Sequence, residues 1–311
     1  MKNLFRIKKL ALIAVVAILS ISCNDDDDPA PVAVDNSITA KAIATPNLSI
    51  LVQALTKAKL AGVLQTGGPY TVFAPTNAAF EKYLADNKIL SLDAISDEKL
   101  TQILLNHVVS DKVLSSQLKT GYISTLAKES TTNNYISMYI NKASGAKLFN
   151  GVANVETADV IASNGVVHIV DEVIDVPTIV THAVANSSFS TLASVLTAQG
   201  LIPTLSGTAS SPFTVFAPLN SAFDDATLSL YTSLSSDNKS AVLKYHVVTG
   251  ANVLASGIPT TPINTFQGQA INIAGTVITD AEGRKTNIVL TNVQCGNGVI
   301  HAIDKVLLPK L

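Results

Sequence analysis

The 311-residue chain predicts two tandem domains of the α+β class, placed after an export signal and a short linker. One observation is an internal repeat of more than a hundred residues, far longer than the roughly 20–50 residues of a solenoid unit. Another is that each copy combines strand-like alternation with helical spacing of apolar residues. The third is a basic N-terminus followed by a short apolar run. We expect a signal peptide over residues 1–22, a linker over 23–36, and domains over 37–175 and 176–311.

The repeat consists of three blocks that keep the same order in both copies. A strand-like block ends at Pro75 and again at Pro218, a central block surrounds His107 and His246, and a last block contains the other paired histidines. The spacing between equivalent residues shrinks from 143 to 139 to 133 positions, so the second copy has shorter loops. The residues that define the first and last blocks are Pro75, Asn77, Phe80, Asn164, Gly165 and His168, and Pro218, Asn220, Phe223, Asn297, Gly298 and His301.

Each block predicts a local structure. Proline ends the first strand, because the residue before proline is held extended, and Thr76 or Asn77 in one copy, and Asn220 or Ser221 in the other, can then cap a helix. The Asn-Gly dipeptides predict a hairpin turn, because they adopt positive φ at low cost. Helical spacing of apolar residues extends over 48–64 and 189–205, and a second helix that runs into a strand is expected over 99–107 and 239–246.

Taken together, these blocks resemble the signature boxes of the fasciclin family. The resemblance covers nearly all of residues 37–311, in both copies. It implies that each domain is a twisted β-sandwich or wedge with several small helices packed on one side. It also implies adhesion through contacts with proteins or glycans.

The residue pattern at the N-terminus predicts export from the cytoplasm and attachment to a membrane. The apolar run Leu10–Leu19 is shorter than the about 20 residues that span a bilayer. The stretch that ends at Cys23 resembles a bacterial lipobox, which implies cleavage before this cysteine and a lipid on its sulfur; the alternative is an uncleaved anchor helix. The run Asp25–Asp28 resembles the export signal of surface lipoproteins in the Bacteroidetes, and its alternative is a solvated spacer.

Net charge and cysteine content indicate which binding partners and disulfide bonds the chain can have. The first 22 residues hold four of the 21 Lys and Arg, which leaves 17 against 23 acidic residues and a net charge of −6. A mildly acidic chain argues against a nucleic-acid partner. If Cys23 carries lipid, Cys295 has no partner in the chain, and we expect it to be a buried apolar residue.

The histidines do not form a pattern typical of catalysis or metal binding. His168 and Asp171, like His301 and Asp304, are three positions apart on a strand and therefore point to opposite faces. No nucleophile elbow or phosphate loop is present in the sequence. We expect no metal, no cofactor and no enzymatic activity.

One pair of residues suggests a binding epitope. In metazoan fasciclin domains a Tyr-His pair is linked to integrin-mediated adhesion, and this resemblance makes Tyr245 and His246 candidate binding residues. The first copy has His107 preceded by Asn106 instead of tyrosine. The alternative, which we favour, is that these side chains are partly buried and structural.

The expected function is adhesion, or binding of an extracellular protein or polysaccharide, by a lipid-anchored protein on the outer face of the outer membrane. The alternative is an accessory lipoprotein that captures glycans or organises the envelope beside a nutrient-uptake system. A hydrolase is a third class. The sequence leaves open the ligand, the oligomeric state, the relative orientation of the two domains and the membrane face.

Overall fold

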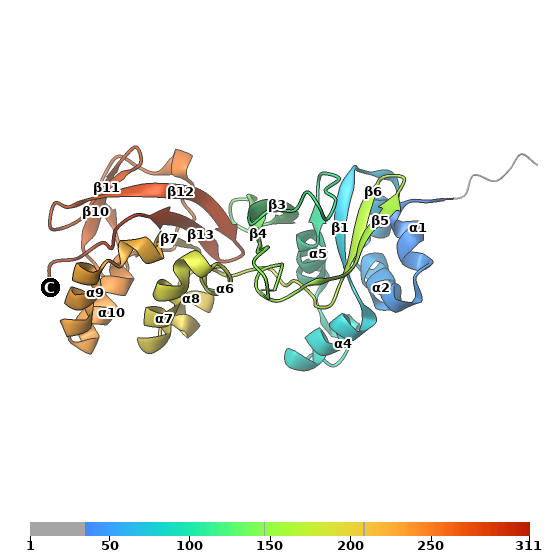
Figure 1. Ribbon diagram of the computed structural model, residues 1–311, viewed down its shortest axis with the longest axis horizontal. Helices are drawn as coiled ribbons and strands as arrows, with labels where there is room; N and C mark the ends of the chain where they lie inside the picture. Colours follow the sequence, from blue (N-terminus) through green and yellow to red (C-terminus); the bar gives the residue numbers. More distant parts are fainter. Residues whose placement is uncertain (1–34, 146, 208) are drawn as a thin grey trace, which may run out of the picture. The chain divides into compact units, whose positions relative to one another are not determined.

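A computed structural model describes residues 35–145, 147–207 and 209–311. The expected signal peptide, Cys23 and the acidic run lie outside the described residues. Asn36 to Leu311 form one unit that contains two successive α+β domains (Figure 1). The predicted fold class is therefore confirmed.

The first domain extends from α1 to β6. It places its small helices early, before and after strand β1, and its longest strands late in the sequence. Its elements are α1 Ile38–Ile43, η1 Pro46–Leu48, α2 Ser49–Lys57, α3 Ala61–Thr66, β1 Tyr70–Pro75, α4 Asn77–Asp86, η2 Leu92–Ala94, α5 Asp97–Asn106, β2 Val108–Val109, β3 Gly121–Lys128, β4 Tyr135–Ile140, β5 Val155–Ala162 and β6 Gly165–Val170.

The second domain repeats this order from α6 to β13. Its elements are α6 Ile179–Ala185, η3 Ser187–Phe189, α7 Ser190–Ala198, α8 Ile202–Ser206, β7 Phe213–Pro218, η4 Asn220–Ala222, α9 Asp225–Ser233, α10 Ser236–Tyr245, β8 Val247–Thr249, η5 Ala255–Gly257, β9 Ile263–Asn264, β10 Ala270–Ala274, β11 Val277–Thr279, β12 Lys285–Cys295 and β13 Gly298–Ile303.

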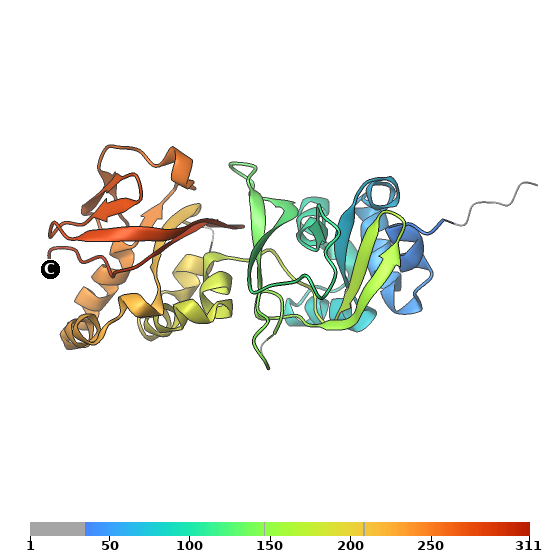
Figure 2. The same cartoon turned by 45° about the horizontal axis from the view of Figure 1, so that its top comes forward.

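The two strands that carry repeated motifs lie side by side in each domain. The first domain has a sheet in the order β2-β1-β6-β5 and a separate hairpin β3-β4, and the second has one sheet in the order β8-β7-β13-β12-β11-β10-β9. In both, the strand that ends in proline pairs in parallel with the strand that carries the histidine, so Phe73 lies opposite His168 and Phe216 opposite His301. Figure 2 shows the long β12 strand (orange-red) beside β13 in this sheet.

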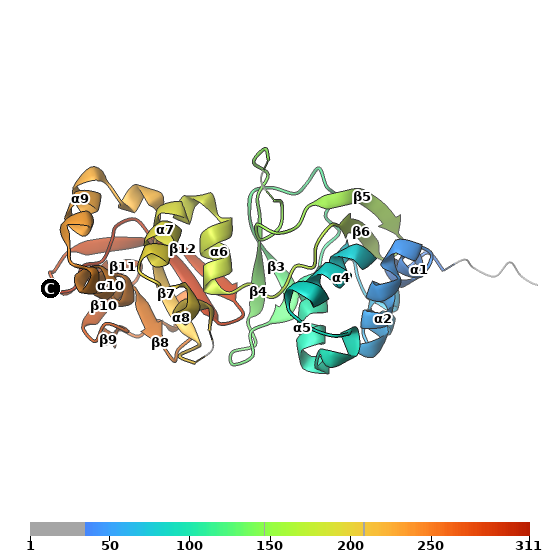
Figure 3. The ribbon, with the colours of Figure 1, turned by 90° about the horizontal axis from the view of Figure 1, so that it is seen from below.

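Each central strand separates two apolar cores. Side chains alternate between the faces of a strand, so Val72 and Ala74 pack against the helices while Phe73 packs on the other side with Met138 and Phe149. In the second domain Val215 and Ala217 lie in the helix-side core and Phe216 in the opposite core, formed with β10, β11 and β12. Figure 3 shows α6, α7 and α8 in front of the strands of the second domain, on one side of its sheet.

The structure divides the predicted long helices in two. Helix α2 ends before Lys59, which has φ 56°, and α7 ends before Gly200, which has φ 64°. A residue in the left-handed region ends a helix, and glycine adopts this conformation most readily. The apolar spacing continues through the break, because α3 and α8 pack on the same core as the helices before them.

The helix after the proline also differs between the two copies. Thr76 caps α4, because its side chain accepts a hydrogen bond from the Ala79 N–H, and α4 extends over ten residues. Leu219 holds the equivalent position, offers no capping oxygen, and is followed by only the short η4. Asp224 then caps the separate helix α9. The predicted caps at Asn77, Asn220 and Ser221 are therefore wrong; Thr76 is the cap in the first copy.

No single helix among the described residues is long and apolar enough to cross a membrane. Helix α6 and the helical stretch 187–198 reach that length and composition only as a pair, with a bend of 101° between them.

Candidate functional site

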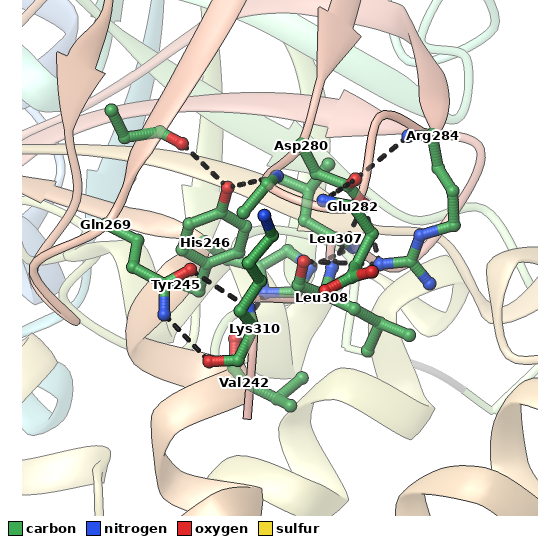
Figure 4. A network of polar contacts seen from close by, with 12 residues as sticks. Val242, Tyr245, His246, Gln269, Asp280, Glu282, Arg284, Leu307, Leu308 and Lys310 are labelled. Carbon is green, nitrogen blue, oxygen red and sulfur yellow. Dashed lines mark hydrogen bonds and ion pairs between the residues drawn. The ribbon is translucent and has the colours of Figure 1, made fainter.

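The Tyr245–His246 pair lies in the core at the end of α10 (Figure 4). Tyr245 is 0% exposed and His246 is 3% exposed. The Tyr245 hydroxyl donates to the carbonyl of Ala270 at 2.8 Å and accepts from the N–H of Ala281 at 2.9 Å. Both its hydrogen-bonding directions are therefore used within the domain.

His246 joins α10 to the C-terminal segment. Its Nδ1 donates to the Val242 carbonyl at 2.8 Å, and its Nε2 accepts from the Leu307 N–H at 2.9 Å. Because a carbonyl only accepts and an N–H only donates, these partners require a neutral imidazole with its proton on Nδ1. Burial lowers the pKa of His246 from 6.5 to about 4, against smaller opposing effects from Val242 and Asp280.

The same segment is held by an ion pair between the buried Asp280 and the exposed Arg284, also drawn in Figure 4. Arg284 Nη2 lies 2.7 Å from Asp280 Oδ2, and the Asp280 side chain is 1% exposed. The carboxylate also accepts from the Leu308 N–H, and Arg284 donates to the Leu308 carbonyl. These contacts fix the chain that covers His246.

His107 occupies the equivalent position in the first domain. Its Nδ1 donates to the Ile103 carbonyl at 2.8 Å, and its Nε2 accepts from the Ile174 N–H at 2.9 Å. Burial lowers its pKa from 6.5 to about 4 as well. Asn106, which stands in place of the tyrosine, is buried and donates to the carbonyls of Ile174 and Asp175.

The strand histidines hold a loop against a bulged strand. His168 Nε2 donates to the Val113 carbonyl at 2.9 Å, and its Nδ1 accepts from the Asp159 N–H at 3.2 Å. His301 makes the same bonds to Val253 and Asn292. Asp159 and Asn292 both have positive φ, at 60° and 61°, which marks the bulge where β5 and β12 shift register.

The aspartates three positions after these histidines do not contact them, because residues three apart on a strand point to opposite faces. Asp171 accepts from the Asn154 N–H and pairs with Lys147, and Asp304 accepts from the Asn287 N–H. The carboxylate that does approach His168 is that of Asp159, at 3.9 Å, which sequence spacing did not indicate. Within 35–145, 147–207 and 209–311, no three His, Cys, Asp or Glu residues are grouped so that they could hold a metal ion.

The motif asparagines connect segments that are distant in the sequence. Asn164 accepts from the Ile38 N–H, at the start of α1, and donates to the Leu64 carbonyl; Asn297 makes the same contacts to Ile179 and Leu205. Asn77 and Asn220 bond in the same way to the start of α2 and of α7. The repeated polar residues thus hold the fold together.

The remaining motif residues support the core. Phe80 and Phe223 are buried in the helix-side cores, and Pro75 and Pro218 end the parallel strands opposite Val170 and Ile303. Cys295 is 0% exposed and is a free thiol, and burial raises its pKa well above 9.0. The lipid-attachment residue Cys23 stays a prediction, because it lies outside the described residues.

A family model described as the fasciclin domain matches residues 46–177 and again 187–309. The chain belongs to the fasciclin-domain family. The resemblance inferred from the three sequence blocks is therefore confirmed for both copies.

Bacterial and animal proteins are among the known proteins similar to this chain. Protein sll1483 of Synechocystis sp. is 38% identical over 144 residues, which cover 46% of this chain and 76% of that protein. Periostin of Homo sapiens is 27% identical and the transforming growth factor-beta-induced protein ig-h3 of Sus scrofa 29% identical, each over 81% of this chain. The chain spans only 30% and 36% of the length of these two animal proteins.

A search of solved structures finds a FAS1 domain pair from the insect cell adhesion molecule fasciclin I. The two are 21% identical, with a TM-score of 0.47, and the match covers 87% of this chain and 95% of that one.

The two fasciclin domains meet through residues that no repeated motif contains. Asn186 donates to the Tyr122 hydroxyl at 3.1 Å, the Gln294 N–H donates to Ser137 Oγ at 3.1 Å, and Asn252 donates to Thr132 Oγ1 at 2.8 Å. The partners from the first domain lie on the β3–β4 hairpin, and the others lie in the second domain. Sequence reasoning missed them because isolated Ser, Asn and Gln residues give no pattern.

A surface hollow of about 400 Å³ opens beside this contact. Val152 of the first domain and Val184 of α6 line it and are 42% and 65% exposed. Hydroxyl and amide groups surround them, among them Asn141, Thr178, Thr181 and Ser206. Apolar residues ringed by polar groups are typical of contact surfaces for another molecule.

Proposed function

We propose that this chain is a lipid-anchored protein of the bacterial outer surface that mediates adhesion by binding an extracellular protein or polysaccharide. The observation that carries the proposal is the tandem pair of fasciclin domains, since the family resemblance implies adhesion. A lipid on Cys23 and an outward orientation directed by Asp25–Asp28 complete the proposal. Both rest on the sequence patterns of the N-terminus.

Adhesion suits a chain of this design energetically. Many copies on one membrane raise the effective concentration of binding sites, so weak contacts add up to firm attachment. The hollow lined by Val152 and Val184 is our candidate contact region. We do not assign this role to Tyr245 or His246, because buried side chains are covered while the domain is folded.

The test is a binding array of matrix proteins and glycans probed with residues 24–311. We expect binding to at least one class, and loss of this binding in Val184→Asp. Leu230→Asp, at a position that is 46% exposed on α9, is the matched control and should bind as the parent does. Absence of binding across both arrays would contradict the proposed function, and binding to polysaccharides without attachment of cells would favour glycan capture.

A further inference from the structure

We propose that His182 makes the contact between the two fasciclin domains sensitive to acid, so that protonation of its imidazole separates the domains. The proposal rests on where this histidine lies, on what surrounds it, and on its absence from the repeated motifs.

His182 is enclosed by both domains. It belongs to α6 of the second domain and is 0% exposed. Its ring forms a T-shaped contact with Tyr122, on β3 of the first domain, with ring centres 5.3 Å apart and planes at 81°. Neither ring nitrogen has a hydrogen-bond partner. The imidazole is therefore held by shape and apolar contact, and a ring N–H is already unsatisfied in the neutral form.

The groups around His182 do little to stabilise a charge on its ring. The titratable groups that act on Tyr122, the ring in contact with His182, are Tyr139 on β4 and Cys295 on β12, and burial raises the pKa of all three. These groups are therefore neutral at acidic pH. The carbonyls of Ser137 and Gln294 favour the protonated ring, but without hydrogen-bonding geometry they do not offset burial.

One carboxylate lies at the same contact, at the turn of the β3–β4 hairpin. Glu129 is 2% exposed and accepts hydrogen bonds from Thr131, Thr132 and, at 3.4 Å, from Asn252 of the second domain. Burial opposes the shift, but the hydrogen bonds from Thr132 and Thr131 lower its pKa below the ordinary 4.5. Protonation of Glu129 would weaken this contact at a lower pH than protonation of His182.

The direction of the effect follows from the shift at His182. Burial lowers the pKa of His182 from 6.5 to about 4. The domain contact is therefore fully stable above pH 6.5 and loses stability as the pH falls from 6.5 toward 4. In the separated form the ring is hydrated and binds a proton at its ordinary pKa. Linkage between these two values predicts that the ratio of separated to closed molecules rises about thirtyfold between pH 7.5 and pH 5.

His182 is distinct from the histidines that belong to the fold. Helices α1 and α6 start in the same way, with Ile38 and Ile179 bonded to the motif asparagines, so Lys41 occupies the position equivalent to His182. The paired histidines lie within one domain, where both ring nitrogens are bonded. Protonation of a paired histidine therefore requires that its domain unfold, whereas protonation of His182 requires only that the domains separate.

Hydrogen exchange of residues 24–311 at several pH values tests the proposal, because it detects rare open states. The Gln294 N–H bonds to Ser137 of the other domain, so its protection reports separation. We expect its protection factor, corrected for intrinsic exchange, to fall about thirtyfold from pH 7.5 to pH 5, as the two pKa values of His182 predict. The Phe216 N–H, which bonds to the His246 carbonyl inside the second domain, is the internal control. It exchanges only when that domain unfolds, so its protection should exceed that of Gln294 at every pH.

The variants His182→Phe and His182→Gln identify the titrating group, since neither side chain takes up a proton. We expect Gln294 protection in both to be nearly flat between pH 7.5 and pH 5. Two variants are used so that poor packing of either one does not end the test. An unchanged thirtyfold fall in the variants would overturn the proposal. Equal protection of Gln294 and Phe216 would overturn it as well, because it would show that Gln294 exchanges through unfolding of the domain.

Discussion

At the scale of residues, the paired histidines are structural links. Each central histidine connects the last turn of a helix to a chain segment more than 60 positions later, through one donated and one accepted hydrogen bond. The sequence indicated that these side chains are enclosed, since they stand between an apolar helix and a Val-Val strand. It could not indicate Ile174 and Leu307 as partners, because any backbone N–H offers the same bond.

We predict that His246→Ala and His107→Ala destabilise the chain. Each change leaves a buried N–H and a buried carbonyl without a partner, at about 1–3 kcal/mol, and adds a cavity. Urea denaturation of residues 24–311 measures the loss. Ile43→Ala, at a position that is 64% exposed, is the control and should cost within about 0.5 kcal/mol. A His246→Ala chain that unfolds at the parent midpoint yet loses binding would make Tyr245–His246 an adhesion site.

At the scale of elements, the Asn-Gly turns allow close approach of two parallel strands. Gly165 and Gly298 have φ of 156° and 151°, and an added Cβ would lie 2.0 Å from the Tyr70 carbonyl oxygen and 2.2 Å from that of Phe213. The sequence predicted these turns. It did not predict that the neighbouring asparagine holds the first helix of each domain, because that contact spans over a hundred positions.

We predict that Gly165→Ala and Gly298→Ala each destabilise the chain by more than about 2 kcal/mol, through backbone strain and overlap with the neighbouring strand. Gly62→Ala is the matched control, since it lies within α3 with no atom within 4 Å of the added Cβ. That change should stabilise the chain by about 0.5–1 kcal/mol. Thermal unfolding compares the three variants, and equal midpoints would contradict the close approach.

Helix boundaries were predicted less well than the helices themselves. Apolar spacing runs unbroken across Lys59 and Gly200, where a left-handed residue follows the end of α2 and of α7. Glycine at position 200 favours this conformation, whereas Lys59 gives no such signal. The shorter helix after Leu219 has a cause visible in the sequence, since leucine cannot cap as Thr76 does. Spacing therefore predicts which face is buried, and capping side chains decide where a helix begins.

At the scale of the whole molecule, the internal repeat predicted the family and the number of domains. It did not predict the contact between the domains. That contact depends on Tyr122, Ser137, His182 and Gln294, whose residue types are common on any surface. One signal was present: His182 is the histidine that has no equivalent in the other copy. Residues that break a repeat are therefore candidates for contacts between its copies.

We predict that Cys23→Ala releases the protein from the membrane, because the proposed anchor is a lipid on this one sulfur. Labelling of cells with radioactive palmitate, followed by separation of membrane and soluble fractions, measures the effect. The matched change Cys295→Ala should leave the labelling intact, since this thiol is buried. Undiminished label in Cys23→Ala would show that the lipobox assignment is wrong.

We predict that alanines in place of Asp25–Asp28 leave the protein lipidated but facing the periplasm. The reason is that the acidic run follows the anchor directly, where export signals of surface lipoproteins lie. Protease treatment of intact cells distinguishes the two orientations. Equal digestion of parent and variant would show that the four aspartates act only as a solvated spacer.

Attachment of living cells tests the central claim, adhesion at the cell surface, most directly. Bacterial cells that produce the parent chain are compared with cells that lack it and with cells that produce Cys23→Ala, on surfaces coated with the ligand found by array. We predict firm attachment of the parent cells, and attachment at background level in the other two, because the proposed function requires both the fasciclin domains and the anchor. Equal attachment of all three would contradict the account.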